Sequence, residues 1–462
     1  MKTLRNAVIG IFAGLILMIS CKKSDIALPK SEANIDSIAS KYYEGYLKMY
    51  PLEATMQGDS RYNDLLSNNI SSEFISKEIE FYTDTQKKLK SIDYDDLSDE
   101  QKTVYDVLDY TLKDKIERYA YHPELLPFSQ FEGLPLDFPL LGSAEGNQPF
   151  KTTKDYDNWL KRIDAFVIWM NTAEKNFREG MKQNVVLPKK LVVKMIPQMH
   201  SEEIITEDFD KNIFYGPIKK MPKNFSAKDK EKYKILYQEA ISSKIIPAYQ
   251  KMGDFLEKEY LPKARNTDGI NAIPNGKNIY EYYAKSWTTT NKTPEEINKI
   301  GLQQVAMLRA EMEKVKTQLG FKGSLEQFLT SLKTDKKAMP YKTPEEVIAA
   351  FNGILKKIEP KLPSMFSKFP KTPFEIRRTE KFREASASAE YKQGTPDGKR
   401  PGIFYTPIPD ATKYNVTNGF ESLFLHEAIP GHHYQISLQQ ENMEIPKFMR
   451  FGWFGAYGEG WA

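Results

Sequence analysis

Apolar residues recur every three or four positions along most of this chain, a spacing that places them on one face of an α-helix. The pattern begins at Ile35 with "IDSIASKYYEGYLKMY" and returns in several long segments. Few segments show the alternating pattern of a strand, so the sequence predicts a mainly α-helical fold. The clearest later amphipathic segments are 156–183, 227–263 and 299–318.

Helix-start signals support this prediction at three places. Ser98 precedes Gln101 by three residues, which is the spacing of a capping box. Thr293 is followed by Pro294 and two glutamates, and the same "TPEE" signal recurs at 343–346. A proline at the first helical position, with acids in the first turn, favours a helix start. The sequences that follow the two copies differ, so they do not indicate a repeat architecture.

Two short segments are candidates for strands. "LVVKMI" at 191–196 is a continuous apolar run, and "GIFYTPI" at 402–408 follows an Asp-Gly turn signal. Pro407 cannot donate a backbone hydrogen bond, which confines the second strand to a sheet edge or ends it there. The proline-rich segment 122–150 is too apolar for a linker, so we expect it to line or cover a cleft. Since no low-complexity linker interrupts 35–462, we predict a single mostly helical domain of two lobes with a small β element.

Composition and charge narrow the class of protein. Of the 462 residues, 40% are hydrophobic and 28% are charged, which is typical of a soluble globular protein with an ample core. The formal net charge is only +4, and lysines and acids are interspersed. The sequence therefore lacks the basic footprint of a nucleic-acid-binding protein, and we expect no nucleic-acid partner.

The N-terminal residues have a different character. Lys2 and Arg5 precede an apolar run from Ala7 to Ile19, which is shorter than the ~20 residues of a membrane span. Cys21, the only cysteine, follows shortly after this run. The order resembles a bacterial lipoprotein signal, in which the cysteine is lipidated and becomes the mature N-terminus. A buried structural cysteine is the alternative.

The resemblance to a lipoprotein signal implies an exported protein anchored to a membrane of the cell envelope. Residues 1–20 are then the signal peptide, and residues 21–34 form a polar tether after the lipidated cysteine. Lys22 is not the aspartate associated with inner-membrane retention in some bacteria, which favours the outer membrane. With Cys21 acylated, no thiol is left for a disulfide, so stability depends on the core.

The segment "ESLFLHEAIPGHHYQ" at 421–435 holds three of the five histidines. It begins with His426 and Glu427, as a zinc-protease helix does, but a proline follows where the second histidine belongs. Zinc binds imidazoles and carboxylates at about 2.0–2.2 Å, so two ligand atoms on one ion lie roughly 3.3 Å apart. On an unbroken helix, neither His432 nor His433 can approach His426 this closely.

The same segment supplies a break in the helix. Pro430 has no N–H to donate to the His426 carbonyl, and Gly431 permits the backbone angles that follow. A break that absorbs two residues makes His432 the second ligand, whereas one that absorbs three selects His433. Absorbing two residues is less disruptive, so we favour His432. His433 is then the alternative ligand or a substrate contact.

A third ligand is expected from a later helix. Glu459 in "FGAYGEGWA" is the only acid between Glu444 and the end of the sequence. Glu427, next to the first ligand, cannot easily reach the same ion but can reach a water on it, which is the position of a general base. The pattern predicts one zinc ion held by His426, His432 and Glu459. The alternatives are a helix end stabilised by imidazoles and a carboxylate in a surface turn.

The motif also carries a family resemblance. "HEAIPGHHYQ" followed by "GEGWA" resembles the bacterial domain-of-unknown-function 885 (DUF885) family, itself similar to the gluzincin zinc peptidases. "YPLEATMQGDSRYND" at 50–64 and "ASAEYKQGTPDGKRPGIFY" at 387–405 resemble further blocks of that family. The resemblance spans most of the mature chain. It implies a large two-lobed, helical, zincin-like domain with a deep channel, one zinc ion on the three proposed ligands, and Glu427 as base.

Substrate contacts follow only from this resemblance. In such peptidases an edge strand beside the active-site helix binds the substrate backbone, and "GIFYTPI" occupies the corresponding place, which implies contacts from Phe404 and Tyr405. Arg400 beside this strand is a candidate for reading a substrate carboxylate, with a solvated loop charge as the alternative. The family pattern continues past "EGWA", so we expect a chain truncated at Ala462.

Two functional hypotheses follow. The first is a zinc peptidase of the bacterial cell envelope that acts on short peptides, with Glu427 moving the proton. The second is a catalytically silent surface lipoprotein that binds peptide or glycan in the same cleft. The complete set of two histidines and two glutamates favours the enzyme.

Overall fold

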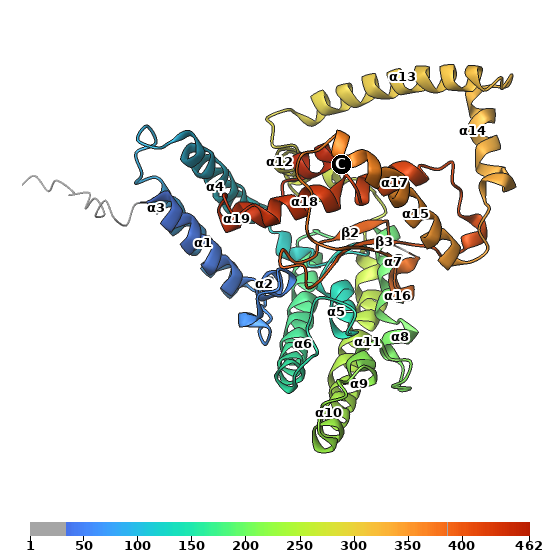
Figure 1. Ribbon diagram of the computed structural model, residues 1–462. Coiled ribbons are helices and arrows are strands. Elements are labelled where there is room, and N and C mark those ends of the chain that lie inside the picture. The colour runs from blue at the N-terminus through green and yellow to red at the C-terminus, as the bar shows by residue number, and fades with distance from the viewer. Residues whose placement is uncertain (1–33, 386) are drawn as a thin grey trace, which may run out of the picture.

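The computed structural model describes residues 34–385 and 387–462, where the chain is mainly helical with one small sheet (Figure 1). The prediction of a mainly α-helical protein with a small β element is confirmed. The expected signal peptide, Cys21 and nearly all of the expected tether lie outside the described residues. Among the helices that the structure describes, none combines the length and apolar character needed to cross a bilayer.

The first helices form one core at the left of Figure 1. The side chains of Tyr82, Leu108 and Leu112 are fully buried in it, and Phe448 from a much later helix joins them. The predicted capping box at Ser98 is present in both directions and begins α4. The helices are α1 (Ile35–Met49), α2 (Pro51–Met56), α3 (Ser72–Leu89), α4 (Asp99–Arg118) and, from the later segment, α19 (Lys447–Arg450).

A second, larger core lies among the helices of the lower half of Figure 1. Phe138 and Phe166 stack there with ring centroids 4.0 Å apart, and Trp159 lies 4.5 Å from the same Phe138 ring. The long helical segment predicted at 227–263 is present, with two π-helical turns. The helices are α5 (Leu134–Gly142), α6 (Thr153–Lys182), α7 (Lys189–Met199), α8 (Glu202–Ile205), α9 (Gly216–Lys219), α10 (Ala227–Ala240) and α11 (Ile246–Phe255).

The strand prediction for 191–196 is wrong, because this segment lies inside α7. Val192, Met195 and Met199 are fully buried, whereas Val193 is 53% exposed. These positions have the three-to-four spacing of a helix, which a six-residue apolar run is too short to reveal.

The sheet has three strands in the order β1-β3-β2. They are β1 (Phe374–Arg378), β2 (Glu390–Lys392) and β3 (Gly402–Thr406). β3 pairs in parallel with β1 and antiparallel with β2. The predicted strand exists and ends just before Pro407, but it is the central strand. The expectation of an edge strand at 402–408 is therefore wrong, and β2 is an edge instead.

A third core joins this sheet to the C-terminal helices. Phe351 of α15 lies against Phe404 of β3 and Phe420 of α17, at ring centroid distances of 5.2 and 4.2 Å. Apolar packing thus holds the sheet against the segment that carries the histidines. The helices are α12 (Gly276–Thr288), α15 (Pro344–Ile358), α16 (Lys381–Glu384), α17 (Phe420–Glu427), α18 (His432–Glu441) and α20 (Gly455–Trp461).

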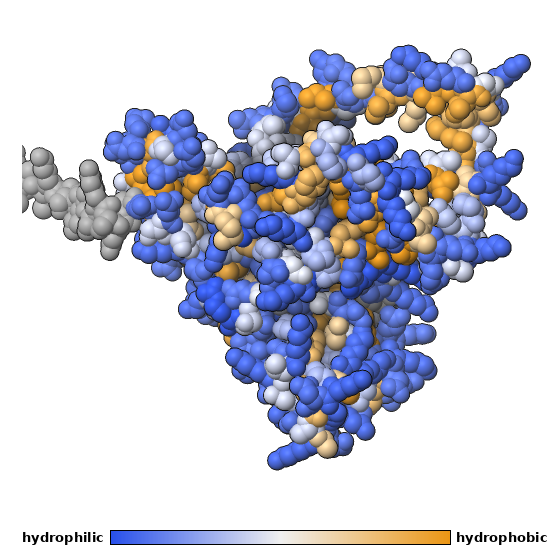
Figure 2. Space-filling view, viewed as in Figure 1, coloured by the Kyte–Doolittle hydropathy of each residue, from blue (hydrophilic) through white to orange (hydrophobic). Residues whose placement is uncertain are grey.

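Two helices stand apart from these cores. α13 (Pro294–Gln318) begins at the predicted Thr293 helix start, where a capping box is present, and it has no buried residue; α14 (Leu325–Thr334) follows it. Figure 2 shows apolar side chains along both helices. Leu302 and Val305 are 64% and 61% exposed, so the described residues do not cover this face of α13.

Candidate metal centre

The helix that carries the motif is interrupted at the Pro-Gly pair. α17 ends at Glu427 and α18 begins at His432, with four non-helical residues between them. Across this break the Gly431 N–H donates to the Leu425 carbonyl at 2.9 Å, and the Tyr434 N–H donates to the Ala428 carbonyl at 3.4 Å. Each bond spans six residues instead of the four of an α-helix. The break therefore absorbs two residues.

Gly431 is required by a close backbone approach. A Cβ atom at this position would lie 1.9 Å from the His426 carbonyl oxygen and 2.3 Å from that of Leu425. No side chain can occupy this space without moving the backbone. Pro430 contributes by lacking the N–H that a continuing helix would donate to the His426 carbonyl.

Three side chains converge beside the break. The Nε2 atoms of His426 and His432 lie 3.3 and 3.6 Å from the same carboxylate oxygen of Glu459. The two imidazole rings are nearly perpendicular, with centroids 4.6 Å apart. One potential ligand atom from each residue lies within 4.8 Å of the other two. Ligand atoms on one tetrahedral zinc ion are roughly 3.3 Å apart, so the group fits a zinc ion after small side-chain movements.

Glu459 reaches this position because α20 packs against α18 and α12. The Nε1 atom of Trp461 donates to the Pro430 carbonyl at 2.7 Å, which joins the end of α20 to the break itself. Trp461 was not among the site residues predicted from the sequence. Its position two residues after Glu459, on the same short helix, was the available signal.

His432 is enclosed by protein. Its side chain is 9% exposed, and its ring lies 5.6 Å from that of Trp453. Burial lowers the pKa of His432, although Glu459 acts in the opposite direction. A neutral imidazole is the form that binds a metal. The other ring nitrogen, Nδ1, is buried and has no hydrogen-bond partner among the described residues.

Glu427 lies next to the first histidine but in a drier environment, and it is only 7% exposed. Burial, together with the charges of Glu459 and Glu390, raises the pKa of Glu427 to about 7. A backbone hydrogen bond from Tyr391 in β2 acts in the opposite direction. Glu427 therefore faces the free edge of the sheet and is poised to exchange a proton near neutral pH.

His433 lies away from this group. It is 2% exposed, and its ring lies 4.9 Å from that of Phe374 in β1. Its Nδ1 atom is 3.0 Å from the Tyr391 hydroxyl. Burial lowers the pKa of His433 to about 4, so the ring is neutral at neutral pH. His433 is thus a buried residue between α18 and the sheet and does not join the other two histidines.

The residues implied as substrate contacts are packed elsewhere. Phe404 is fully buried in the third core, and Tyr405 is 3% exposed with the Arg383 guanidinium 5.3 Å from its ring centroid. Arg400 donates to the carbonyl of Thr55 at 3.4 Å and to that of Met56. It therefore binds backbone oxygens at the end of α2 and is not a solvated loop charge. Burial lowers the pKa of Arg400 to about 10.

The described residues contain one other group with metal-ligand spacing, formed by His200, Asp254 and Glu257. Its histidine lies 4.0 Å from Asp254, and Asp254 already pairs with Lys258 at 3.0 Å. This second group is therefore a weaker candidate for a metal site.

The fold is similar to the crystal structure of a "putative lipoprotein" from Colwellia psychrerythraea, with a TM-score of 0.84 and 22% sequence identity. The alignment covers 92% of this chain and 76% of that chain. No curated protein matches. A family model described as bacterial protein of unknown function (DUF885) matches residues 51–462, so this chain belongs to the DUF885 family.

Proposed function

We propose that this protein is a zinc-dependent peptidase of the bacterial cell envelope that acts on short peptides. The observation that carries the proposal is the convergence of His426, His432 and Glu459, with the buried carboxyl group of Glu427 beside them. Two histidines and a glutamate are a common ligand set for catalytic zinc, which keeps a further position for water or substrate. The proposal includes a two-lobed, gluzincin-like arrangement with a deep channel.

A bound zinc ion supplies a Lewis acid that polarises a carbonyl group and acidifies water. His426 and His432 would hold the ion as neutral imidazoles, and Glu459 would contribute the negative charge. Glu427 would take a proton from the attacking water and return it to the leaving amine. Burial raises the pKa of Glu427, and the positive charge of a bound ion would favour its carboxylate form.

The edge of β2 is the proposed site for the substrate backbone. β3 is paired on both sides, so its N–H and C=O groups are used within the sheet. β2 pairs with β3 on one side only, and its Tyr391 N–H is directed at Glu427. An extended peptide that adds to this free edge runs past the base, in the manner of strand addition.

The location rests on the N-terminal sequence. Lys2, Arg5 and the apolar run before Cys21 are the features of a lipoprotein signal. We propose lipidation at Cys21 and anchoring in the outer membrane. Replacing Cys21 by serine should move the protein to the soluble fraction, as measured by fractionation of membranes. Retention in the membrane after signal cleavage would contradict this anchor.

Metal analysis of the purified protein tests the function most directly. We expect close to one equivalent of zinc, lost in His426→Ala. In Glu427→Gln we expect zinc to stay and peptide hydrolysis to fall roughly 10²–10⁴-fold, since the ligands remain and only proton transfer is lost. A wild-type protein without zinc would remove the basis of the proposal. Zinc binding without hydrolysis of any peptide would support the silent binding protein instead.

A further inference from the structure

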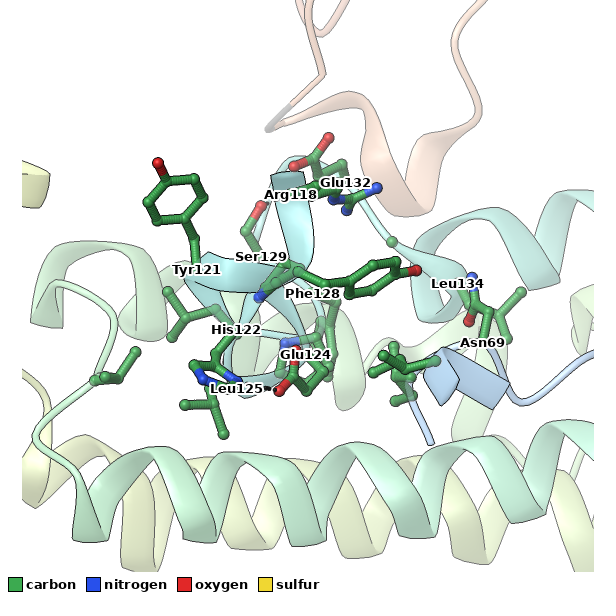
Figure 3. Close-up of a pocket in the computed structure, with 18 of the residues that line it drawn as sticks. Asn69, Arg118, Tyr121, His122, Glu124, Leu125, Phe128, Ser129, Glu132 and Leu134 are labelled. Atoms are coloured by element: carbon green, nitrogen blue, oxygen red, sulfur yellow. Dashed lines mark hydrogen bonds and ion pairs between the residues drawn. The ribbon is translucent and has the colours of Figure 1, made fainter. Parts of the chain in front are cut away.

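A partly open cavity of about 840 Å³ is lined by the first helices, the segment 122–137 and part of the second core. The expectation that 122–150 lines a cleft is thus met by its first half. Figure 3 shows Arg118 and Glu132 on one side of the cavity and His122, Glu124 and Leu125 nearer the long helices. This volume is in the range of sites for small ligands. It is too small for a folded protein segment.

Two cations at the end of α4 line this cavity. Lys115 and Arg118 are three residues apart, so they share one helical face. Within the described ranges neither side chain has a hydrogen bond or an ion pair within 4.0 Å, and Lys115 lies 5.8 Å from the centroid of the Tyr46 ring. Lys113 on the same helix differs, because it pairs with Asp109 at 2.5 Å. Lys115 and Arg118 thus face the cavity without a partner, whereas His122 and Glu124, which also line it, pair with each other at 2.9 Å.

The carboxylates nearby do not neutralise this pair. Glu78 is 1% exposed and accepts hydrogen bonds from the hydroxyl groups of three tyrosines, which are Tyr50, Tyr82 and Tyr119. Burial raises the pKa of both Glu53 and Asp137, which makes these groups poorer anions. Burial and the adjacent charge of Arg118 lower the pKa of Lys115, which means that the charged form of Lys115 is disfavoured. A bound anion would favour the charged form again.

A second cavity shares part of this lining and lies nearer the metal centre. Glu53 and Lys115 line both cavities, and the second one, of about 370 Å³, extends to Trp453 and Gly455. The Trp453 ring lies 5.6 Å from the His432 ring, and Gly455 begins the helix that carries Glu459. Lys115 therefore lies between the large cavity and one whose lining includes a neighbour of a proposed zinc ligand.

We propose that Lys115 and Arg118 bind the free α-carboxylate of a short peptide whose scissile bond lies at the metal centre. This specificity rests on the proposed peptidase function. Two cations that line one cavity, neither with a hydrogen bond or an ion pair among the described residues, match one carboxylate. Charge-assisted bonds from Arg118 add directional contacts. The preferred substrate is therefore a short peptide with a free C-terminus.

The first test uses the zinc-loaded full chain and three matched peptides. One has a free C-terminal carboxylate, the second is its C-terminal amide, and the third is an amide that ends in glutamate. We expect kcat/KM for the free acid to exceed that of both amides roughly 10- to 100-fold, the factor for a hydrogen-bonded charged group. Equal rates for acid and amide would overturn the proposal. Equal rates for the acid and the glutamate amide would overturn the terminal carboxylate as the group recognised.

Variants then assign the effect to the two cations. Lys115→Met and Arg118→Gln should each reduce the preference for the acid over the amide roughly tenfold, chiefly through a lower kcat/KM for the acid. Arg118→Lys keeps the charge and should retain part of the preference. Lys113→Met is the control on the same helix and should leave the preference unchanged. A preference that survives in Lys115→Met and Arg118→Gln would contradict the assignment.

Direct binding separates this proposal from the peptidase function. Calorimetry with Glu427→Gln, which should bind without turnover, compares the acid with its amide in the presence of zinc. If Glu427→Gln binds the acid more tightly than the amide but the wild-type protein hydrolyses neither peptide, the carboxylate subsite is supported and the peptidase function is rejected. If the wild-type protein hydrolyses acid and amide equally well, the peptidase function is supported and the carboxylate subsite is rejected. Failure of both peptides to bind would overturn the subsite.

Discussion

Trp461 donates a hydrogen bond from Nε1 to the carbonyl oxygen of Pro430 at 2.7 Å. This bond joins two parts of the candidate metal centre that are separate in the chain. Pro430 lies in the break that brings His432 to His426, and Trp461 is two residues beyond Glu459. This contact therefore ties the helix that carries Glu459 to the break that positions the two histidines, in addition to the packing of α20 on α18 and α12.

Removing this contact should weaken zinc binding. Trp461→Phe keeps an aromatic ring, which lies 6.2 Å from that of Phe366 in the present structure, but cannot donate to Pro430. We expect the Kd for zinc to rise roughly tenfold, as for other contacts that orient metal ligands. Competition with a chelating dye measures the Kd. Tyr457→Phe is the control, because Tyr457 lies on the same helix and is 61% exposed. An unchanged Kd in Trp461→Phe would mean that α20 is held by other contacts.

The break should not tolerate a side chain at Gly431. In Gly431→Ala the new Cβ atom meets the His426 carbonyl at 1.9 Å, so α17 and α18 must separate. We expect a loss of about 1–3 kcal/mol in the free energy of unfolding, together with weaker zinc binding. Urea denaturation of the metal-free protein measures the first effect. Gly460→Ala is the control, since nothing lies within 4 Å of its Cβ position. Equal stability of the two variants would show that the break relaxes freely.

The local parts of this architecture could be predicted from the sequence. The caps at Ser98 and Thr293 depend on residues three positions apart, and the structure has both. The two-residue break is likewise a local consequence of Pro430 and Gly431, because a missing N–H and a missing Cβ act on the same turn. The sequence therefore favours His432 over His433, and the geometry brings His432 to His426.

The parts that depend on distant residues could not be predicted. β2 has only three residues, two of them charged, and its place at the sheet edge depends on pairing with β3. Arg400 binds carbonyl groups more than 300 residues earlier in the chain, which no local pattern indicates. The anchor from Trp461 to Pro430 is non-local in the same way. The place of Lys115 and Arg118 beside the cavity could not be predicted either, because in the sequence they look like ordinary residues of an amphipathic helix.

The cavity should make stability depend on the ionisation of Glu53. Burial raises the pKa of Glu53 and Asp137 adds to this effect, while Lys115 opposes it. A carboxyl group whose pKa is higher in the folded state binds protons more strongly there. Its contribution to stability is complete below the unfolded pKa near 4.5 and is lost as the pH rises through the folded value. Glu53→Gln should therefore be more stable than the wild type at pH 7, with a difference that shrinks toward pH 4.

Urea denaturation at several pH values between 4 and 7 measures this difference. Glu73→Gln is the control, because Glu73 is exposed on α3 and pairs with Lys77 at 2.6 Å. Lys77 lowers the pKa of Glu73. Glu73→Gln should therefore be slightly less stable than the wild type at pH 7, which is the opposite sign. A Glu53→Gln protein that is less stable than the wild type at pH 7 would show that Glu53 forms a stabilising ion pair.

Separate replacement of the neighbouring histidines tests the ligand assignment. His432→Ala should weaken zinc binding by at least about 100-fold, since a direct ligand contributes more than the residues that orient it. His433→Ala should retain zinc, because the His433 ring contacts Phe374 and the Tyr391 hydroxyl on the other side of α18. It should instead lower the free energy of unfolding by about 1–3 kcal/mol through the lost hydrogen bond. Zinc titration and urea denaturation of each variant distinguish the two roles. Loss of zinc in His433→Ala with retention in His432→Ala would mean that the break absorbs three residues in the metal-bound protein.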